Sequence, residues 1–481
     1  MRGLFEKQRD EMQIVAPRIV PAADSNTTRL ATWIHGFAYD DLPENVSQFA
    51  KGLVLDTIAV AWAANSASGM QAALDTVLAE GGASLSTLWG SPHRLGPGAA
   101  AFYNSALASA LDYDSLHERG GVHSDAVVVP AALAVGETRR VDGRNLLASY
   151  VAASELNFRL GRATLSTSGW FRTSVYGVFA AAAASAKLLG LDAAQTQHAL
   201  GIALSLASGT QQPNIERKLT KRLQSAFAAR SGVFAAQLAS RGITAPDAPF
   251  DGKFSLYALY DEGDPTQAFG DLGEVFLLTD TVLKKFPSCA CTHAAIQATL
   301  DLQRDHALTP DDIEQVEVIL TPYMHRLVGA PFSLDGDLEV TAQFSVQYTV
   351  ATALLRGAFT AADLSPEHVR DTRVHALIAK IKVSIDEASS GRLSPATVII
   401  TAIGGRQRTG TVTALPGGLD LPLSPKELRH KAASAFATGQ HALAPSKVSA
   451  LIDRIENLER VRDVSKLFEG IVANSLYRVA N

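Results

Sequence analysis

Acidic and histidine side chains gather in one short segment of the chain, Leu111 to Ser124. The segment lies between two apolar stretches whose spacing predicts helices, and it contains Asp112, Asp114, His117 and His123. Carboxylates and imidazoles are the usual groups of general acid–base catalysis, and loops between rigid helices often present such groups. The alternative is structural, with the aspartates solvated or capping the next helix and the histidines on the surface.

A second segment supplies cations. Lys221 and Arg222 stand at the start of a stretch that is predicted to be helical as far as Gly242. Basic side chains there add to the positive field of the helix N-terminus, and this arrangement attracts carboxylates. The alternative is an ordinary pair of solvent-facing cations.

A third segment brings together two lysines, two thiols and an imidazole, in the order Lys284, Lys285, Cys289, Cys291 and His293. Metal binding by the last three is conceivable, but their spacing suits tetrahedral zinc poorly and no fourth ligand is near in the sequence. Two cysteines are also too few for an iron–sulfur cluster of the usual kind. We therefore expect neither a metal nor a cofactor.

Composition narrows the function classes. The 481 residues are 47% hydrophobic and 19% charged, with a net charge of −5 and no basic excess for binding nucleic acid. No apolar run reaches the roughly 20 residues of a membrane span, and Met1 to Arg18 lacks the apolar centre of a secretory signal. A cytoplasmic protein without nucleic-acid or membrane partners is expected.

The elements that must position these segments are mostly helical. Alanine, leucine and valine recur at helical spacing through residues 27–268, which predicts a large helical domain. The helices expected in it are Glu44 to Ala64, Gly98 to Leu111, Asp125 to Glu137, Arg144 to Leu160, Tyr176 to Leu189, Ala193 to Ala207 and Lys221 to Arg241.

Residues 269–415 differ in pattern and predict a smaller α+β domain. Val316 to Leu320 alternates as a strand does, and Ala396 to Thr413 resembles a hairpin turning at Gly404 and Gly405. The helices expected between them are Thr292 to Arg304 and Gln343 to Arg356. Residues 416–481 are helical again and are expected to return to the first domain. The predicted fold class is mainly α, with a helical domain and an α+β lid.

These segments together resemble the MmgE/PrpD family over nearly the whole chain. The matching stretches follow one another in the family's order and spacing: Asp112 to Pro130, Gly169-Trp170 with Gly177 to Ala182, Lys221 to Gln224 with Ala228 to Gly232, and Lys284 to His293. The resemblance implies a helical domain with a lid, a homodimer, and a small di- or tricarboxylic acid as substrate. Family members include 2-methylcitrate dehydratase, cis-aconitate decarboxylase and iminodisuccinate epimerase, none of which requires a metal.

The resemblance also implies residue roles. His123 would be the general acid or base, and Asp112 would orient it or favour its protonated form. Lys221 and Lys284 would bind carboxylates and stabilise a carbanion, because preorganised cations stabilise negative charge as it develops. The residues expected around the substrate are Ser115, Trp170, Phe171, Arg172, Arg222, Cys289 and His293.

One position departs from the family pattern. Where the decarboxylases and dehydratases have histidine after the tryptophan of this loop, the chain has Phe171, followed by Arg172. The lid tyrosine of the decarboxylases has no clear counterpart near Leu327. Phenylalanine carries neither proton nor charge, so poor catalysis of cis-aconitate and 2-methylcitrate is expected, while Arg172 could clamp a carboxylate. If Phe171 instead points into the helical core, the departure has no bearing on function.

The sequence thus favours a metal-independent lyase, a dehydratase of a hydroxy-polycarboxylic acid, that takes a proton from the carbon next to a carboxylate. An epimerase or isomerase of a dicarboxylic acid and a decarboxylase of the cis-aconitate type are the alternatives. A non-catalytic binding protein on the same fold is a further one, although Asp112, His123, Lys221 and Lys284 are all present.

Overall fold

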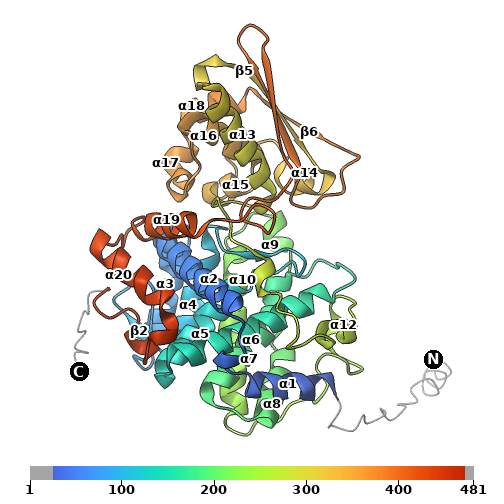
Figure 1. Cartoon of the computed structure of the whole chain (residues 1–481), viewed down its shortest axis with the longest axis vertical. Helices are drawn as coiled ribbons and strands as arrows, with labels where there is room; N and C mark the ends of the chain where they lie inside the picture. Colours follow the sequence, from blue (N-terminus) through green and yellow to red (C-terminus); the bar gives the residue numbers. More distant parts are fainter. Residues whose placement is uncertain (1–24, 472–481) are drawn as a thin grey trace, which may run out of the picture.

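The computed structural model describes residues 25–471 and shows a helical body beneath a smaller lid (Figure 1). The helices of the body are α1 (Asn26–Gly36), α2 (Glu44–Ala63), α3 (Met70–Glu80), α4 (Pro97–Ala110), α5 (Asp125–Arg139), α6 (Gly143–Arg162), α7 (Arg172–Leu189), α8 (Ala193–Leu204) and α10 (Thr220–Ala239), with short α9 (Gln212–Ile215), α11 (Leu256–Leu259) and α12 (Pro265–Phe269). Their arrangement confirms the mainly α fold with a smaller α+β part.

Small residues bring the central helices of the body close together. Helix α10 packs against both α7 and α4, and α7 also packs against α5 and α6. At Gly232 in α10, an added Cβ atom would lie 2.4 Å from the Cβ of Ala181 in α7, so only glycine fits there. The alanine-rich sequence therefore explains why these helices form the buried centre of the molecule.

The lid combines a four-stranded sheet with helices. Its strands, β5 (Ile313–Leu320), β6 (Ile381–Ile385), β7 (Ala396–Ala402) and β8 (Gln407–Val412), lie in the order β6-β5-β7-β8. Strand β5 is parallel to β6 and antiparallel to β7. Gly404 and Gly405 adopt positive φ angles of 91° and 79° in the β7–β8 turn, a conformation that glycine tolerates best. The predicted hairpin is confirmed.

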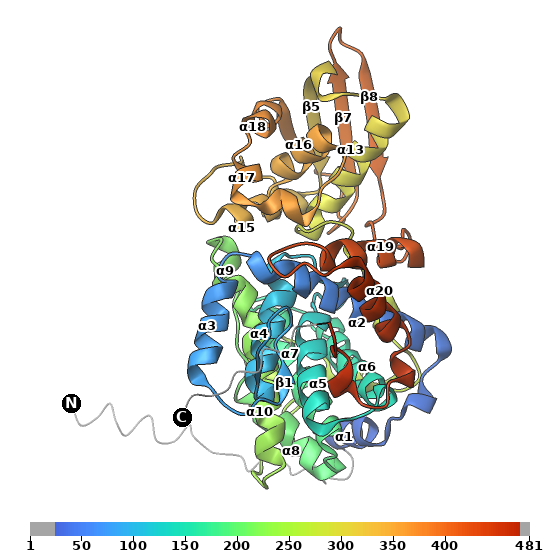
Figure 2. The same cartoon turned by 90° about the vertical axis from the view of Figure 1, so that its left-hand side faces the viewer.

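Helices cover one side of this sheet, as Figure 2 shows. The helices of the lid are α13 (His293–His306), α14 (Pro322–Val328), α15 (Leu338–Gln343), α16 (Val346–Arg356), α17 (Pro366–Val369) and α18 (Thr372–Ile378). Helix α13 packs on β7 and β8, and α16 packs on α13 and α18. The helix predicted from Gln343 to Arg356 is α16 and begins three residues later, at Val346, because the Ser345 side chain caps its start by accepting from the Tyr348 N–H, and Gln343 is the last residue of α15.

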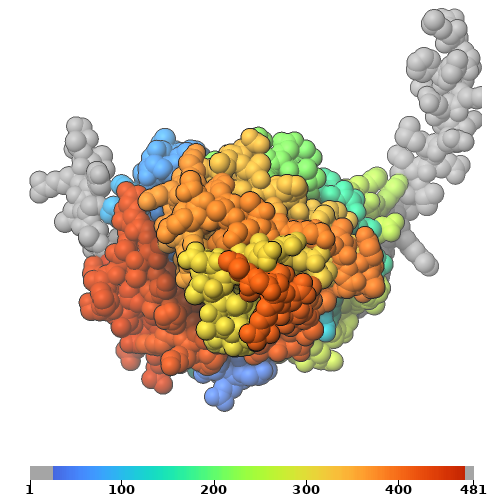
Figure 3. Space-filling view, turned by 90° about the horizontal axis from the view of Figure 1, so that it is seen from above, coloured from blue at the N-terminus to red at the C-terminus, as the bar shows by residue number. Residues whose placement is uncertain are grey.

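The chain returns to the body after the lid. Helices α19 (Pro425–Phe436) and α20 (Pro445–Glu456) both pack against α2 near the opposite end of the sequence. Seen from above, this C-terminal segment lies beside the lid (Figure 3). The division at residues 268 and 415 stays a prediction, and Met1 to Arg18 lies outside the described residues.

Three further findings complete the fold. Helix α7 begins at Arg172, four residues before the predicted start, so the Trp170-Phe171 pair directly precedes its first turn. Strand β6 was not anticipated, because its sequence alternates too weakly to mark it. No helix among residues 25–471 is both long and apolar enough to cross a membrane.

Candidate active site

Asp112 lies between two lysines that come from distant parts of the chain. Directly after α4, Asp112 adopts a positive φ of 49°, uncommon for a residue with a side chain. The Lys284 ammonium lies 3.0 Å from its Oδ2 and donates to its backbone oxygen at 2.6 Å, and Lys221 from the start of α10 contacts its Oδ1. These contacts hold the strained turn, and such strain often marks a functional position.

The three charges stabilise one another. Burial alone would raise the pKa of Asp112, but Lys221, Lys284 and His123 hold it well below its usual range. For Lys284, burial works in the opposite sense, and Asp112 and Asp114 raise the pKa of the ammonium above its ordinary value. Asp112 and Lys284 are therefore both ionised at neutral pH, before any ligand binds.

His123 pairs with Asp114, and this differs from the expected pairing with Asp112. The Nδ1 atom of His123 lies 3.2 Å from Oδ2 of Asp114 and 2.8 Å from the backbone oxygen of Ser115. Burial would raise the pKa of Asp114, but His123 and the lysines lower it. Because Asp112 is engaged by both lysines, Asp114 is the carboxylate that orients the imidazole.

The acidic loop is anchored by its remaining side chains. The Ser115 hydroxyl contacts the buried Asp125, whose other oxygen accepts from Tyr150 at 2.5 Å. His117 is buried and stacks on Phe158 at 4.3 Å, with its Nδ1 accepting from the backbone of the same loop. Ser115 therefore presents its carbonyl, not its hydroxyl, to His123, and His117 has a structural position away from the charged cluster.

The lid segment places its thiols and its histidine differently. Cys289 is half-buried, and a hydrogen bond with Cys291, assisted by the charge of Lys284, lowers the pKa of its thiol. His293 is fully buried against Phe286, and burial lowers its pKa to about 3. Within residues 25–471, no three histidine, cysteine or acidic side chains are grouped so that they could hold a metal ion.

The predicted arginines are engaged elsewhere. The guanidinium of Arg222 donates to the Ser68 backbone at 2.9 Å and lies 3.5 Å from Glu339 of the lid, so it ties the body to the lid. Arg172 lies 3.3 Å from the carboxylate of Asp261 and donates to the loop that precedes α7. Neither arginine contacts Asp112 or His123.

The Trp170-Phe171 pair borders the His123 loop. Trp170 packs on Tyr260 with ring centroids 4.8 Å apart. Phe171 is half-buried and, unlike Trp170, does not belong to the hydrophobic core of the described residues. Two residues later, the Thr173 hydroxyl accepts a 3.0 Å hydrogen bond from the His123 backbone. Phe171 therefore lies two residues before a residue that contacts the His123 loop, and its place beside the substrate stays a prediction.

Exposure separates groups that can meet a ligand from groups that support them. The side chains of His123 and Lys221 are 18% and 13% exposed, whereas that of Lys284 is 1% exposed. Since Nδ1 of His123 is occupied, its Nε2 is the nitrogen available for proton transfer. Lys221 also lies 5.6 Å from the Phe344 ring centroid, so an apolar ring borders its ammonium. The arrangement can hold a carboxylate beside a proton carrier.

A second buried pair supports Lys284 from behind and was not anticipated from the sequence. Lys431 in α19 lies 2.7 Å from Asp56 in α2 and donates to the Lys284 backbone oxygen at 2.8 Å. It also lies 3.8 Å from the ring centroid of Tyr113. In the sequence, only Asp56 pointed to this pair. It lies within an apolar run of α2, and buried charges are normally paired.

Comparisons with known proteins agree with this architecture. The family models of the MmgE/PrpD N-terminal and C-terminal domains match residues 28–268 and 286–458. A cis-aconitate decarboxylase-like protein of Aspergillus oryzae is 30% identical over 92% of this chain and 96% of its own. Cis-aconitate decarboxylases of Aspergillus terreus and Homo sapiens are 27% and 28% identical, over 93% and 92% of this chain and 97% and 94% of theirs. The chain belongs to the MmgE/PrpD family and is an enzyme of that type.

Proposed function

We propose that the enzyme is a lyase that removes carbon dioxide from a small di- or tricarboxylic acid related to cis-aconitate. The observation that carries the proposal is that one accessible imidazole, His123, and one accessible ammonium, Lys221, lie near the same two aspartates, Asp112 and Asp114, beside the buried Lys284. Proteins named as cis-aconitate decarboxylases are similar to the chain over nearly its whole length. Their similarity favours loss of carbon dioxide over the loss of water that the sequence motifs favoured.

The number of proton carriers supports this choice. Decarboxylation needs a proton donor for the carbon that loses its carboxylate, but no base to start the reaction. Dehydration needs one group to take a proton and another, or the same one again, to protonate the leaving hydroxyl. Of the imidazoles nearest the cluster, His117 and His293 are buried elsewhere, and only His123 is open to a ligand.

The proposed step uses the groups in fixed roles. The bond between carbon and the departing carboxylate breaks, and its electron pair stays on the carbon. Lys221 binds a remaining carboxylate and stabilises this charge. His123 then delivers the proton from Nε2 to the carbon, while Asp114 holds the resulting neutral ring by its Nδ1–H, and water restores the lost proton. Lys284 and Asp112 are positioning residues, because both are buried behind Lys221.

A dehydratase or an epimerase is the second candidate, and Cys289 favours it. The half-buried thiol has a lowered pKa beside Lys284 and would give the site a second proton carrier. Proton donors on two faces of one carbon are what epimerisation needs. Replacement of Cys289 by serine would then abolish turnover, whereas the decarboxylase mechanism predicts a much smaller effect.

Reaction with a panel of acids in heavy water tests the proposal. The panel contains cis-aconitate, citrate, 2-methylcitrate and iminodisuccinate, together with analogues that carry an apolar substituent to match Phe171. Release of carbon dioxide with one deuterium in the product supports decarboxylation. A new conjugated double bond without carbon dioxide indicates a dehydratase, and deuterium exchange without net conversion indicates an epimerase. The absence of reaction and binding for every acid would contradict the proposal.

The proposal includes three finer statements. We infer that activity needs no metal, so chelators should not change it, and that the protein acts in the cytoplasm. We also infer a homodimer. The exposed rings of Phe227 and Phe234, seven residues apart on α10, support the dimer, because such rings on one helix face favour contact with another chain. Light scattering of the wild type and of Phe234→Glu tests this inference.

A further inference from the structure

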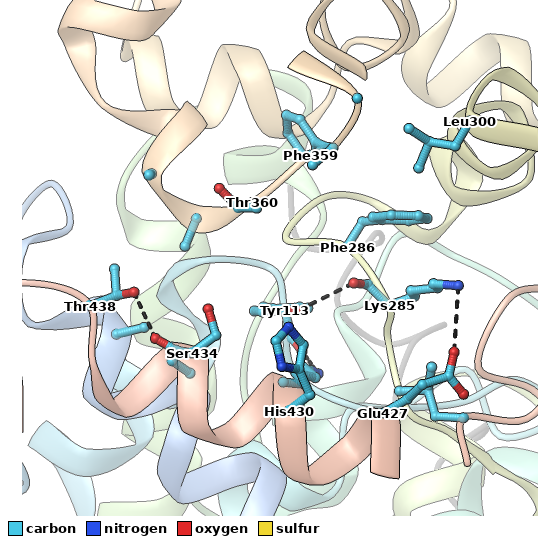
Figure 4. A pocket seen from close by; sticks show the side chains of 18 of the residues that line it. Tyr113, Lys285, Phe286, Leu300, Phe359, Thr360, Glu427, His430, Ser434 and Thr438 are labelled. Carbon is cyan, nitrogen blue, oxygen red and sulfur yellow. Dashed lines mark hydrogen bonds and ion pairs between the residues drawn. The ribbon is translucent and has the colours of Figure 1, made fainter. Parts of the chain in front are cut away.

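A cavity of about 750 Å³ lies between the lid and α19, outside the Asp112 cluster (Figure 4). Helix α19 forms one side with Lys426, His430 and Ser434, and the lid loop 357–362 forms the opposite side. Phe286 from the lid segment lies between them in the close view. The cavity therefore joins two parts of the chain that meet only in the folded structure.

Lys285 and Tyr113 line this cavity, and each is a chain neighbour of residues in the charged cluster. Lys284 directs its ammonium to Asp112, whereas the next residue, Lys285, lines the cavity and lies 3.9 Å from Glu427. The Tyr113 ring also lines the cavity, although both of its chain neighbours are aspartates of the charged cluster. Asp112, His123, Lys221 and Lys284 are not among the residues that line the cavity, which therefore lies beside the cluster.

The charges around the cavity leave one cation, Lys426, and one imidazole, His430, without an acidic partner among the described residues. Lys431 is paired with buried Asp56, and the Glu427 carboxylate accepts from the Ser424 backbone and hydroxyl at the start of α19. Lys426 and His430 form no ion pair with any residue that the structure describes. Their spacing of four residues puts them on one face of α19, where both can approach a single anion.

Most of the rest of the lining is apolar, beside the hydroxyl side chains of Thr360, Ser434 and Thr438. Rings and aliphatic side chains face the cavity from the lid, from α19 and from the end of α2: Ala63, Phe286, Leu300, Phe359, Leu423 and Ala435. A cavity of this size, with an apolar lining and a few convergent polar groups, is typical of small-molecule sites. Its apolar part suits a hydrocarbon or aromatic body, and Lys426 with His430 suits a negatively charged head.

We propose that this cavity binds an amphipathic carboxylate, a small molecule with an apolar body and one carboxylate head, at a site separate from the reaction centre. The apolar body lies against Phe286, Leu300 and Phe359, and the head lies against Lys426 and His430. This class differs from the compact polycarboxylates of the proposed reaction, which have no apolar body. The proposal therefore stands independently of the proposed reaction.

Calorimetric titration of the full-length protein with octanoate, and with 1-octanol as its neutral counterpart, tests the site. The wild type should bind octanoate at least about tenfold more tightly than octanol, the scale of one charge-assisted contact. The double variant Lys426→Gln/His430→Gln should lose this preference. Lys382→Gln/His306→Gln, on the exposed surface of the lid, is the matched control and should bind octanoate as the wild type does.

Two further variants locate the bound octanoate. Ser434→Trp fills the cavity from an exposed position of α19 and should weaken octanoate binding by at least about tenfold, since a ligand excluded from its cavity loses its apolar contacts. Lys221→Met alters the active site and should leave octanoate binding unchanged. Octanoate binding that Lys221→Met abolishes, or that survives both cavity variants, would overturn the proposal. Equal binding of octanol, or no octanoate binding by the wild type, would overturn it too.

Discussion

Lys284 and Lys285 are neighbours in the chain but belong to two regions with different physical character. Lys284 is buried against Asp112, and both the carboxylate and the backbone oxygen of that residue hold its ammonium. Lys285 is 34% exposed at the edge of the outer cavity and lies near Glu427. The comparison shows that burial and pairing distinguish a preorganised reaction centre from an adaptable binding surface, although the residue type is the same.

Substitution of each lysine by methionine tests this comparison through the free energy of unfolding. Lys284→Met should destabilise the fold by about 3–5 kcal/mol, because it leaves Asp112 with one cation fewer and its backbone oxygen unpaired. Lys285→Met, the matched control, should change the free energy of unfolding by less than about 0.5 kcal/mol. Urea denaturation of both variants checks the prediction. Equal destabilisation would show that the buried contacts have no special weight.

The same contrast applies to two histidines of the active-site loop. His123 has a carboxylate partner, whereas burial lowers the pKa of His117 to about 4, against an ordinary value of 6.5. As the pH falls from 6.5 to 4, unfolded chains bind a proton at His117 that folded chains do not. The free energy of unfolding should therefore fall by about 3 kcal/mol through this group.

His117→Asn removes this proton linkage while keeping an acceptor for the loop backbone. Denaturation midpoints at pH 6.5 and pH 4.5 should then differ less in the variant than in the wild type. His306→Asn, at an exposed site, should keep the wild-type difference. An unchanged pH dependence in His117→Asn would contradict the buried, neutral assignment.

Asp114→Asn tests whether the acid beside His123 acts through the imidazole. The variant keeps the shape of the side chain but removes its charge, so His123 should protonate the carbanion less effectively. We expect kcat to fall by at least about tenfold with little change in KM. Asp247→Asn on the surface is the control. A rise in KM alone would instead assign Asp114 to substrate binding.

The substitution Phe171→His tests whether the reaction centre includes the loop before α7. If the ring borders the substrate, restoring the family's histidine should change the rate or the substrate preference by about tenfold, the scale of a positioned acid–base group. Kinetics on the polycarboxylate panel and thermal denaturation provide the measurements. Unchanged kinetics with unchanged stability would place Phe171 outside the site.

The helices of the body could be predicted from the sequence, but several local contacts could not. Alanine and leucine periodicity marks α5, α6 and α10, because a buried helix repeats its apolar positions. Strand β6 is short and half exposed, and therefore leaves little pattern. The start of α16 at Val346, three residues after the predicted start, depends on the Ser345 side-chain cap, which the helical pattern does not reveal.

The contacts of the candidate site could also be predicted only in part. Lys221 and Arg222 are consecutive in a helix and therefore point about 100° apart, so one of them had to face away from Asp112. Family resemblance selected Lys221, but the sequence did not reveal that Arg222 reaches Glu339. The positive φ of Asp112 turns the loop so that Asp114 meets His123. Contacts of this kind depend on backbone geometry, which spacing alone does not encode.

The central claim is that His123 protonates a carbanion formed by loss of carbon dioxide. Carbon dioxide release from the best substrate of the panel, measured for the wild type and for His123→Asn, tests it most directly. We predict a fall in kcat of about 10²- to 10⁴-fold in the variant, with substrate affinity retained. If the wild type releases carbon dioxide and His123→Asn releases it at the same rate, the account is contradicted.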